Sequence, residues 1–297
     1  MIPAERGFLL LSSHLGEKRR NPLTTAQLRL LADRVRGSQW NGADRELEAA
    51  DLMALGYGRE MAERIQRLLE EEDVLDYYLR KGQILGCTPV TRISENYPLH
   101  LRKRLGLDSP GVLWARGNLD LLRQPMVALV GSRELRQENW QFAAEVGRQA
   151  AQQGYVLVSG NARGADRTAQ ESCLEAGGSV ISVVADRLEA QPARERVLYI
   201  SEDGFDAAFS AHRALRRNRI IHSLSEKTVV AQCTYGKGGT WDGTVKNLRQ
   251  GWSQVYCYQD GSAAAKALCN LGACPISEVL PEMLLSESPK QLQMDKI

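Results

Sequence analysis

The sequence lacks the long apolar run that a membrane-spanning helix requires. No stretch approaches the roughly 18 apolar residues of such a helix, and the opening residues, MIPAERGFLLLSS, have no basic segment ahead of an apolar core, as a signal peptide would. The six cysteines form no close pairs, so we expect reduced thiols and not a disulfide framework. We therefore expect a cytoplasmic protein that makes no contact with a membrane.

Metal ligands and a dinucleotide fingerprint are also missing. The four histidines show no ligand spacing, and Cys269 and Cys274 have no second ligand pair nearby, as a zinc site would need. No GxGxxG follows the first apolar strand of the α/β region, which argues against a bound NAD. We expect neither a metal nor any other cofactor.

A strong charge of one sign is absent as well. The 38 Lys and Arg residues face 36 Asp and Glu residues, a net charge of +2. Such a balance gives no general affinity for nucleic acid, so any basic site must be local. Contents of 43% hydrophobic and 25% charged residues are those of a globular protein. The 297 residues allow one large or two modest domains of about 150 residues.

Composition divides the chain into four segments. Residues 1–80 show helical periodicity and no convincing strand, with helices expected after Thr24, around 47–56 and around 61–69. Residues 81–125 carry four prolines and are interpreted as a connector and lead-in.

Residues 126–265 alternate short apolar strands with helices, and 266–297 are interpreted as a C-terminal tail. The expected strands are 126–130, 155–159, 179–184, 228–232 and 254–258. Such alternation favours a parallel sheet with right-handed crossovers and helices on both faces. The expected fold class is therefore α/β, a doubly wound, Rossmann-like parallel sheet preceded by a smaller all-helical domain.

Glycines and cations gather near the ends of these strands, where ligands of doubly wound sheets bind. Glycine lets a backbone approach a phosphate, arginine can clamp one with two donors, and loop amides can converge on an anion. The candidate phosphate-binding residues are Gly131, Ser132, Arg133, Gly160, Asn161, Arg163, Gly164, Arg217, Asn218, Arg219, Lys237, Gly238, Gly239 and Thr240.

Each of these segments also has a purely structural interpretation. Gly131–Arg133 could form a tight turn with a solvated arginine, and the arginine run 213–219 could be a solvated helix face. Loop 235–240 could be a flexible connector. For Asp166 we favour the role of helix N-cap over catalysis. Four such segments, residues 131–133, 159–166, 213–219 and 235–240, recur in one sheet. We therefore expect them to form one basic, glycine-lined groove suited to several phosphates.

The motifs VALVGSR, SGNARGADRTAQ, AGGSVISVV and RRNRIIHSLS make the segment 126–258 resemble the DprA/Smf family of DNA-processing proteins. Residues 97–122 resemble the lead-in of that family, so the likeness covers roughly residues 90–260. The resemblance implies that these loops bind the phosphates of single-stranded DNA, that the protein loads the RecA recombinase, and that the sheet domain forms a homodimer.

The sequence departs from the family pattern in several places. Gln170 stands where the family usually has a histidine, and Leu215-Arg216 replace a common Phe-Pro. Residues 238–242 replace a small Ser-Gly-Ser loop, and no winged helix fits into the tail. The chain therefore resembles a divergent member.

Three functions stay open at this point. The first is a non-catalytic single-strand DNA binder, in which Tyr235 and Trp241 could stack on bases, although backbone contacts should dominate because aromatics make up only 6% of the chain. The second is a nucleotide phosphoribohydrolase, but Trp241 and Asp242 stand where such hydrolases carry a glutamate. The third is a sensor of a nucleotide-derived signal.

The N-terminal helices add a separate observation. Leu55-Gly56-Tyr57-Gly58 resembles the turn of a helix-hairpin-helix, a SAM-like element whose amides contact a DNA phosphate. A plain helical hairpin with a glycine C-cap explains the same residues equally well.

Overall fold

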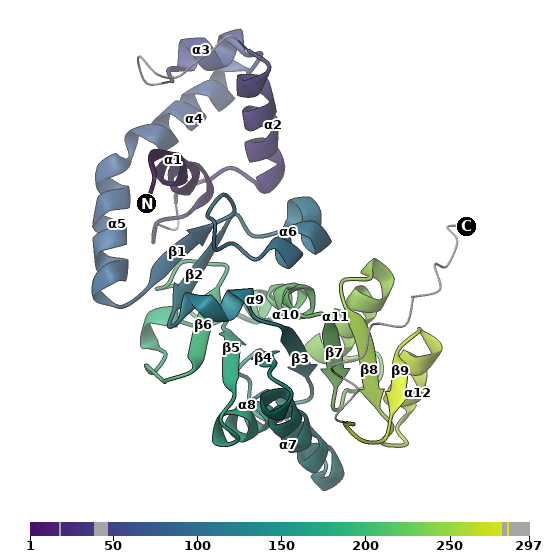
Figure 1. The fold of residues 1–297 in the computed structure, drawn as a ribbon. Coiled ribbons are helices and arrows are strands. Elements are labelled where there is room, and N and C mark those ends of the chain that lie inside the picture. The colour runs from purple at the N-terminus through teal and green to yellow at the C-terminus, as the bar shows by residue number, and fades with distance from the viewer. Residues whose placement is uncertain (18, 39–46, 281–283, 285–297) are drawn as a thin grey trace. The chain divides into compact units, whose positions relative to one another are not determined.

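The computed structural model describes residues 1–17, 19–38, 47–280 and 284. The chain divides into two compact units (Figure 1). The first contains residues 1–117, 186–193 and 199–209, and the second contains 118–185, 194–198 and the chain from 210 onwards.

The first unit opens with helices. They are α1 (Pro3–Ser12), α2 (Thr25–Arg36), α3 (Ala49–Ala54), α4 (Arg59–Glu70) and α5 (Glu72–Ile84). Thr24 caps α2 as predicted, because its hydroxyl accepts a hydrogen bond from the Gln27 amide at 3.2 Å. The helices predicted around 47–56 and 61–69 are confirmed as α3 and α4, whereas α1 and α5 were not among the predicted helices. Leucines of α2, α3 and α4 share one hydrophobic core with Ala62 and Ile65.

The turn between α3 and α4 is a helical hairpin. Gly56 has φ +86°, which favours glycine, and its amide donates to the Met53 carbonyl at 2.9 Å. The Tyr57 amide donates to the Leu52 carbonyl at 3.1 Å. Both amides therefore close the end of α3, in agreement with the glycine C-cap interpretation.

Residues 81–125 are folded, which corrects their interpretation as a connector. They contain β1 (Thr88–Thr91), α6 (Leu99–Leu105), β2 (Val112–Arg116) and the 3₁₀ turns Gly106–Asp108 and Leu119–Arg123. Strand β1 pairs antiparallel with β2, and β2 pairs antiparallel with residues 199–201 of β6 (Val197–Ser201). Pro89 is tolerated because β1 is an edge strand, where a missing amide costs no ladder hydrogen bond.

The second unit is built on parallel strands. They are β3 (Met126–Val130), β4 (Val156–Ser159), β5 (Ser179–Val183), β7 (Lys227–Val230), β8 (Gln254–Tyr258) and β9 (Cys274–Ile276). Their spatial order is β5-β4-β3-β7-β8-β9, and each neighbouring pair is parallel. The parallel sheet and its predicted strands are confirmed.

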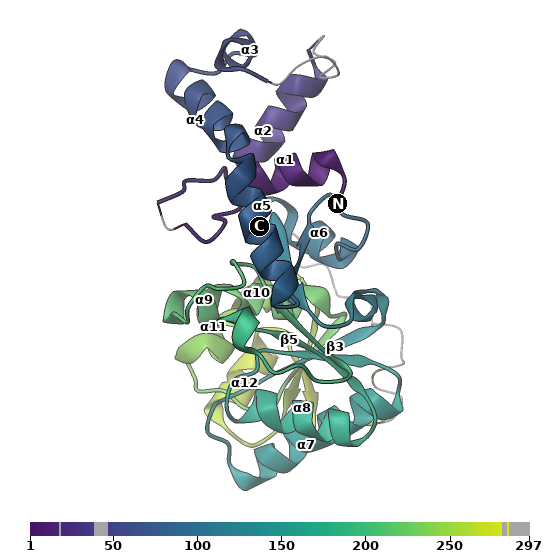
Figure 2. The same ribbon diagram turned by 90° about the vertical axis from the view of Figure 1, so that its left-hand side faces the viewer.

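Helices cover both faces of these strands. They are α7 (Gln137–Gln152), α8 (Ala165–Glu175), α9 (Ala211–Arg216), α10 (Asn218–Leu224), α11 (Gly238–Gln250) and α12 (Ala263–Asn270). Helices α7 and α8 lie on one side of the sheet and α10 and α11 on the other (Figure 2). The second unit is therefore doubly wound, as expected.

Two elements fall in the segment interpreted as a C-terminal tail. Most of α12 and all of β9 lie after residue 265, and β9 pairs with β8 through Cys274–Ile276. This corrects the tail interpretation for residues 266–276. The tail beyond residue 280 lies outside the described residues, apart from Leu284.

The strand order fixes where a ligand site is expected. From β3 the chain proceeds outward to β4 and β5 on one side, then returns to pair β7 with the other side of β3. In doubly wound sheets, ligands bind outside the carboxyl ends of the strands at such a reversal. The loops after β3 and β7 therefore lie at the expected position.

Every helix of the described chain is too short or too polar to cross a membrane.

Candidate functional site

The loop after β3 packs tightly between its two neighbours. A Cβ on Gly131 would lie 2.3 Å from the Ala165 Cβ, so only glycine fits there. The Ser132 amide donates to the Gln232 carbonyl at 2.9 Å, and the Ser132 carbonyl accepts from the Ala165 amide at 3.1 Å. These bonds join the loop to the segments after β7 and β4, while the Arg133 side chain is exposed.

The loop after β4 is shaped around a buried carboxylate. One oxygen of Asp166 accepts hydrogen bonds from the Gly160 amide at 3.1 Å and the Ala162 amide at 3.2 Å. Between them Asn161 adopts a left-handed conformation, with φ +59°. The Asp166 carboxylate therefore accepts from two of the loop amides that we had expected to bind an external anion.

The prediction that Asp166 is a helix N-cap is wrong. Gly164 occupies the N-cap position of α8, and Asp166 lies in the first turn. Gly164 has φ +86°, and a Cβ there would lie 2.4 Å from the Ser132 carbonyl oxygen. This close approach places the glycine at the cap and leaves Asp166 to bond the loop that precedes the helix.

Arg217 lies in the interior beneath this loop, although it was predicted to hold a phosphate. Only 8% of the residue is exposed, and its Nη1 donates to the carbonyls of Gly160 and Val183. A Cβ on Gly160 would lie within 2.7 Å of both the Arg217 guanidinium and an Asp166 oxygen. Arg217 and Asp166 therefore face each other across Gly160.

The charge state of Asp166 reflects this setting. Burial raises the pKa of the Asp166 carboxyl to about 6, while the positive charge of Arg217 and the two amide hydrogen bonds oppose the rise. The carboxylate is thus costly to bury, and the nearby guanidinium offsets part of that cost.

The segment after Arg217 contacts the start of α11. The Asn218 Nδ2 donates to the Gly239 carbonyl at 2.9 Å. Arg219 is half-buried, and its Nη1 donates to the Arg216 carbonyl at 2.8 Å. The arginine run 213–219 does not lie on one continuous helix, because two short helices, α9 and α10, meet at Arg217.

The loop after β7 is shorter than the segment 235–240 that was interpreted as a loop, because α11 begins at Gly238. Gly238, Gly239 and Thr240 therefore form the first turn of α11. The Thr240 hydroxyl donates to the Gly131 carbonyl at 3.0 Å, and Lys237 is exposed just before the helix.

The four predicted segments are thus in direct contact with one another. Gly131 packs on Ala165, Arg217 bonds Gly160, Asn218 bonds Gly239, and Thr240 bonds Gly131.

The cationic side chains at these segments differ in accessibility. Arg133, Arg163 and Lys237 are exposed, and Arg219 is half-buried. The Arg163 Nη2 makes an exposed ion pair with Glu134 at 3.1 Å. Phosphate binding by the candidate residues stays a prediction.

Two sets of contacts at the site were not predicted, although the residues that make them were noted in the sequence. Gln170, which stands where the family has a histidine, is buried, and its Nε2 donates to the hydroxyls of Ser159 and Ser182. Tyr235 and Trp241 form an edge-to-face pair with ring centroids 5.0 Å apart. Their six-residue separation gives no periodic signal, because it spans a loop and a helix start.

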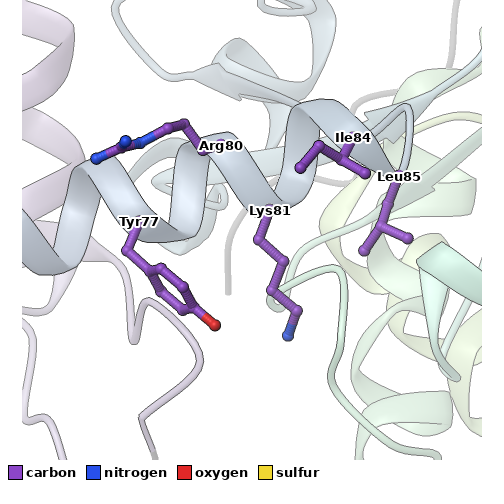
Figure 3. A pocket seen from close by; sticks show the side chains of 5 residues that line it. All are labelled: Tyr77, Arg80, Lys81, Ile84 and Leu85. Carbon is purple, nitrogen blue, oxygen red and sulfur yellow. The ribbon is translucent and has the colours of Figure 1, made fainter.

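Two hollows lie away from the four segments. One, of about 510 Å³, runs along α5 of the first unit and is lined by Tyr77, Arg80, Lys81, Ile84 and Leu85 (Figure 3). Tyr77 and Lys81 extend from the same side of the helix (Figure 3), and Lys81 is paired with Asp206 at 3.0 Å.

The other hollow, of about 430 Å³, lies between α7 and α8 beside Trp140. Neither hollow includes a residue of the four segments. The described part of the chain contains no cluster of His, Cys, Asp and Glu suited to a metal ion.

Comparison with known proteins places the chain in a family. The family model described as DNA recombination-mediator protein A matches residues 88–279. The chain is 29% identical over 205 residues to the DNA processing protein DprA of Streptococcus pneumoniae, an alignment that covers 66% of this chain and 70% of that protein. It spans only 55% and 57% of the length of two further curated relatives.

Solved structures of related proteins have the same fold. The crystal structure of DNA processing protein A from S. pneumoniae matches with a TM-score of 0.72 at 23% identity, covering 91% of this chain and 95% of that one. The protein from Helicobacter pylori, studied for its single-stranded DNA binding mode, matches with a TM-score of 0.55 at 23% identity, covering 65% and 91%.

Since the family model covers more than half of the chain, from β1 to the segment after β9, the protein belongs to the DNA recombination-mediator protein A family, that of the DprA and Smf proteins.

Proposed function

We propose that this protein binds single-stranded DNA as a recombination mediator, through the four contacting segments of the second unit. The observation that carries this proposal is their contiguity, because Arg133, Arg163, Arg219 and Lys237 then belong to one surface at the carboxyl ends of the strands. The single-stranded DNA binding mode described for the Helicobacter pylori relative supports the same ligand.

The side chains divide between two roles in this proposal. The exposed cations contact phosphates, a contact that gives salt-dependent and nearly sequence-independent affinity. Gly131, Gly160 and Gly164 allow the close backbone approach of the segments. Arg217 acts as a positioning residue, because it is buried and donates to main-chain carbonyls.

A direct test is the fluorescence anisotropy of labelled poly-dT over a salt series. We expect binding that weakens steeply as salt rises, and a loss of affinity in the Arg133→Ala plus Arg219→Ala variant. The matched control is Arg148→Ala, since Arg148 lies on α7 outside the four segments and pairs with Glu145. Unchanged binding in the double variant would show that this surface is not the DNA site.

The candidate residues do not favour hydrolysis. Asp242 is exposed in the second turn of α11, and no glutamate accompanies it at the position that nucleotide hydrolases use. We propose a non-catalytic role, and release of base from a nucleoside monophosphate would contradict it. Stabilisation by mononucleotides, without binding of oligonucleotides, would instead assign the site to a nucleotide sensor.

The biological setting of the proposed activity is recombination in the cytoplasm. There the protein would load RecA on the bound strand and act as a homodimer. Sedimentation analysis tests the dimer, and a RecA filament assay on DNA coated with single-strand-binding protein tests the loading. A monomer at all concentrations, or filaments that form no faster with the protein present, would contradict these two points separately.

A further inference from the structure

An aromatic pair lies at the segment 235–240, with Tyr235 as its first residue and Trp241 directly after it. Tyr235 is 60% exposed although it is a large ring, and its partner Trp241 is half-buried in the first turns of α11. Their ring planes meet at 65°, with centroids 5.0 Å apart. In such an edge-to-face pair, one ring supports the other through the attraction between a positive edge and a negative face.

The pair is held in place by the backbone around it. Thr234 and Lys237 form a β-bridge that closes the loop at Tyr235. Gly236, with φ +66°, and Gly238, with φ +85°, supply the turns that side chains disfavour. Tyr235 is therefore presented on a short closed loop, directly before the helix α11 that carries Trp241.

The pair belongs to the same surface as the proposed phosphate contacts. Trp241 follows Thr240, whose hydroxyl bonds the Gly131 carbonyl, and Gly239 accepts from Asn218. Lys237 lies between the two aromatics in sequence and is exposed.

The nearby side chains suit a ligand in which a flat, uncharged group is attached to an anionic backbone. Leu215 is 52% exposed, and a Cβ on Gly239 would lie 3.0 Å from it, so an apolar side chain adjoins the turn that leads to Trp241. The exposed Asp242 would repel a phosphate directly over it, so the strand's phosphates are expected nearer Lys237 and Arg219.

We propose that Tyr235, supported edgewise by Trp241, is a platform on which an unpaired nucleobase stacks. The occupant is a base of a single strand, because a base within a duplex already has both of its faces stacked. Aromatic rings strengthen single-strand binding by contact with any base, whereas the cations hold the phosphates. The platform gives the site preference for single over double strands.

This inference rests on the proposed DNA binding and is tested with two oligonucleotides of equal length, one of dT and one abasic. Both present the same phosphates, but only the first presents bases. Anisotropy with the intact chain should show tighter binding of the dT strand. Tyr235→Ala should weaken dT binding roughly 5- to 150-fold and leave the abasic strand unaffected, while Tyr235→Phe keeps the ring and the affinity.

The outcomes separate the inference from the proposed function. Binding of neither strand by the wild-type protein would overturn both. Binding of both strands with equal loss, or no loss, in Tyr235→Ala would overturn only the platform. Quenching of tryptophan fluorescence by dT supplies a second readout, since it should shrink in Trp241→Phe but persist in Trp140→Phe, which alters an exposed indole outside the four segments.

Discussion

At Asp166 a carboxylate is buried between two main-chain amides and an arginine. The residue is 7% exposed, and the same oxygen accepts from Gly160 and Ala162. Arg217 donates to the Gly160 carbonyl, while Asp166 accepts from the Gly160 amide, so both charged side chains bond the same glycine. These hydrogen bonds hold Asn161 in its left-handed conformation. They thereby fix the path of the backbone towards Arg163.

The Asp166 carboxyl should change how the free energy of unfolding depends on pH. Its pKa is about 6 in the folded protein against 3.8 as the ordinary value, so between pH 4 and 6 the folded state holds a proton that the unfolded state has released. The free energy of unfolding of the wild type, relative to Asp166→Asn, should therefore fall as pH rises through this window. The fall is on the order of 3 kcal/mol.

Urea unfolding of both proteins at several pH values between 3.5 and 7 measures this difference. Groups that titrate equally in both proteins cancel. A difference that stays flat across the window would show that the carboxyl titrates normally.

His222 should produce the opposite trend. It is fully buried, its Nδ1 lies 3.2 Å from the Asn247 Nδ2 and 3.3 Å from the Thr228 hydroxyl, and burial lowers its pKa from 6.5 to about 3. Below pH 6.5, His222 binds a proton in the unfolded chain but stays neutral in the folded protein. The free energy of unfolding therefore falls as pH drops.

The fall attributable to His222 should approach about 1.4 kcal/mol per pH unit below pH 6. It should be reduced in His222→Gln, whose amide oxygen can still accept from Asn247. Chemical unfolding of the two proteins between pH 7 and 4 gives the slopes. Parallel slopes would mean that His222 becomes charged in the folded state.

At the scale of helices and strands, agreement with the sequence depends on how local the signal is. Strands β3, β4, β5, β7 and β8 are short apolar runs bounded by polar or turn residues, and their positions could be predicted. Strand β1 contains a proline that only its edge position allows, and β9 is three residues long. Such strands form because a neighbouring strand has an unpaired edge, and the local sequence pattern does not indicate that neighbour.

The candidate site shows the same limit. Sequence reasoning found the four segments, because glycine and arginine recur at strand ends. It could not separate Arg217 from Arg219, although they are two residues apart in one arginine run. Burial decides their roles, since Arg217 is the C-cap of α9 and its side chain donates to the carbonyls of Gly160 and Val183.

The packing of α7 on α8 depends on one glycine. A Cβ on Gly147 would lie 2.1 Å from the Ala169 carbonyl oxygen, a contact with backbone that no rotamer can relieve. Gly147→Ala should force the helices apart and lower the free energy of unfolding by about 1–3 kcal/mol. Thermal or urea unfolding measures the loss.

The control for this change is Gly7→Ala in α1, where nothing lies within 4 Å of the added methyl group. There the substitution should raise stability by about 0.5–1 kcal/mol, since alanine is the better helix former. Similar effects of the two substitutions would mean that the α7–α8 contact is looser than described.

For the whole molecule, the charge balance determines how binding must depend on salt. With a net charge of +2, the protein as a whole attracts a polyanion weakly, so the affinity depends on the few cations of the four segments. Arg133, Arg163, Arg219 and Lys237 could neutralise three or four phosphates. For a single strand, this predicts a slope of log affinity against log salt of about −2 to −3.

The salt slope also distinguishes a phosphate contact from a positioning role. Arg133→Ala should make the slope shallower by about 0.7, as one released counterion requires. Arg217→Met should instead lower the melting temperature, because it leaves Asp166 buried without its cationic neighbour, and should keep the slope of the folded protein. If Arg217→Met made the slope shallower without loss of stability, Arg217 would reach the DNA, and the site would have to open at Gly160 when it binds.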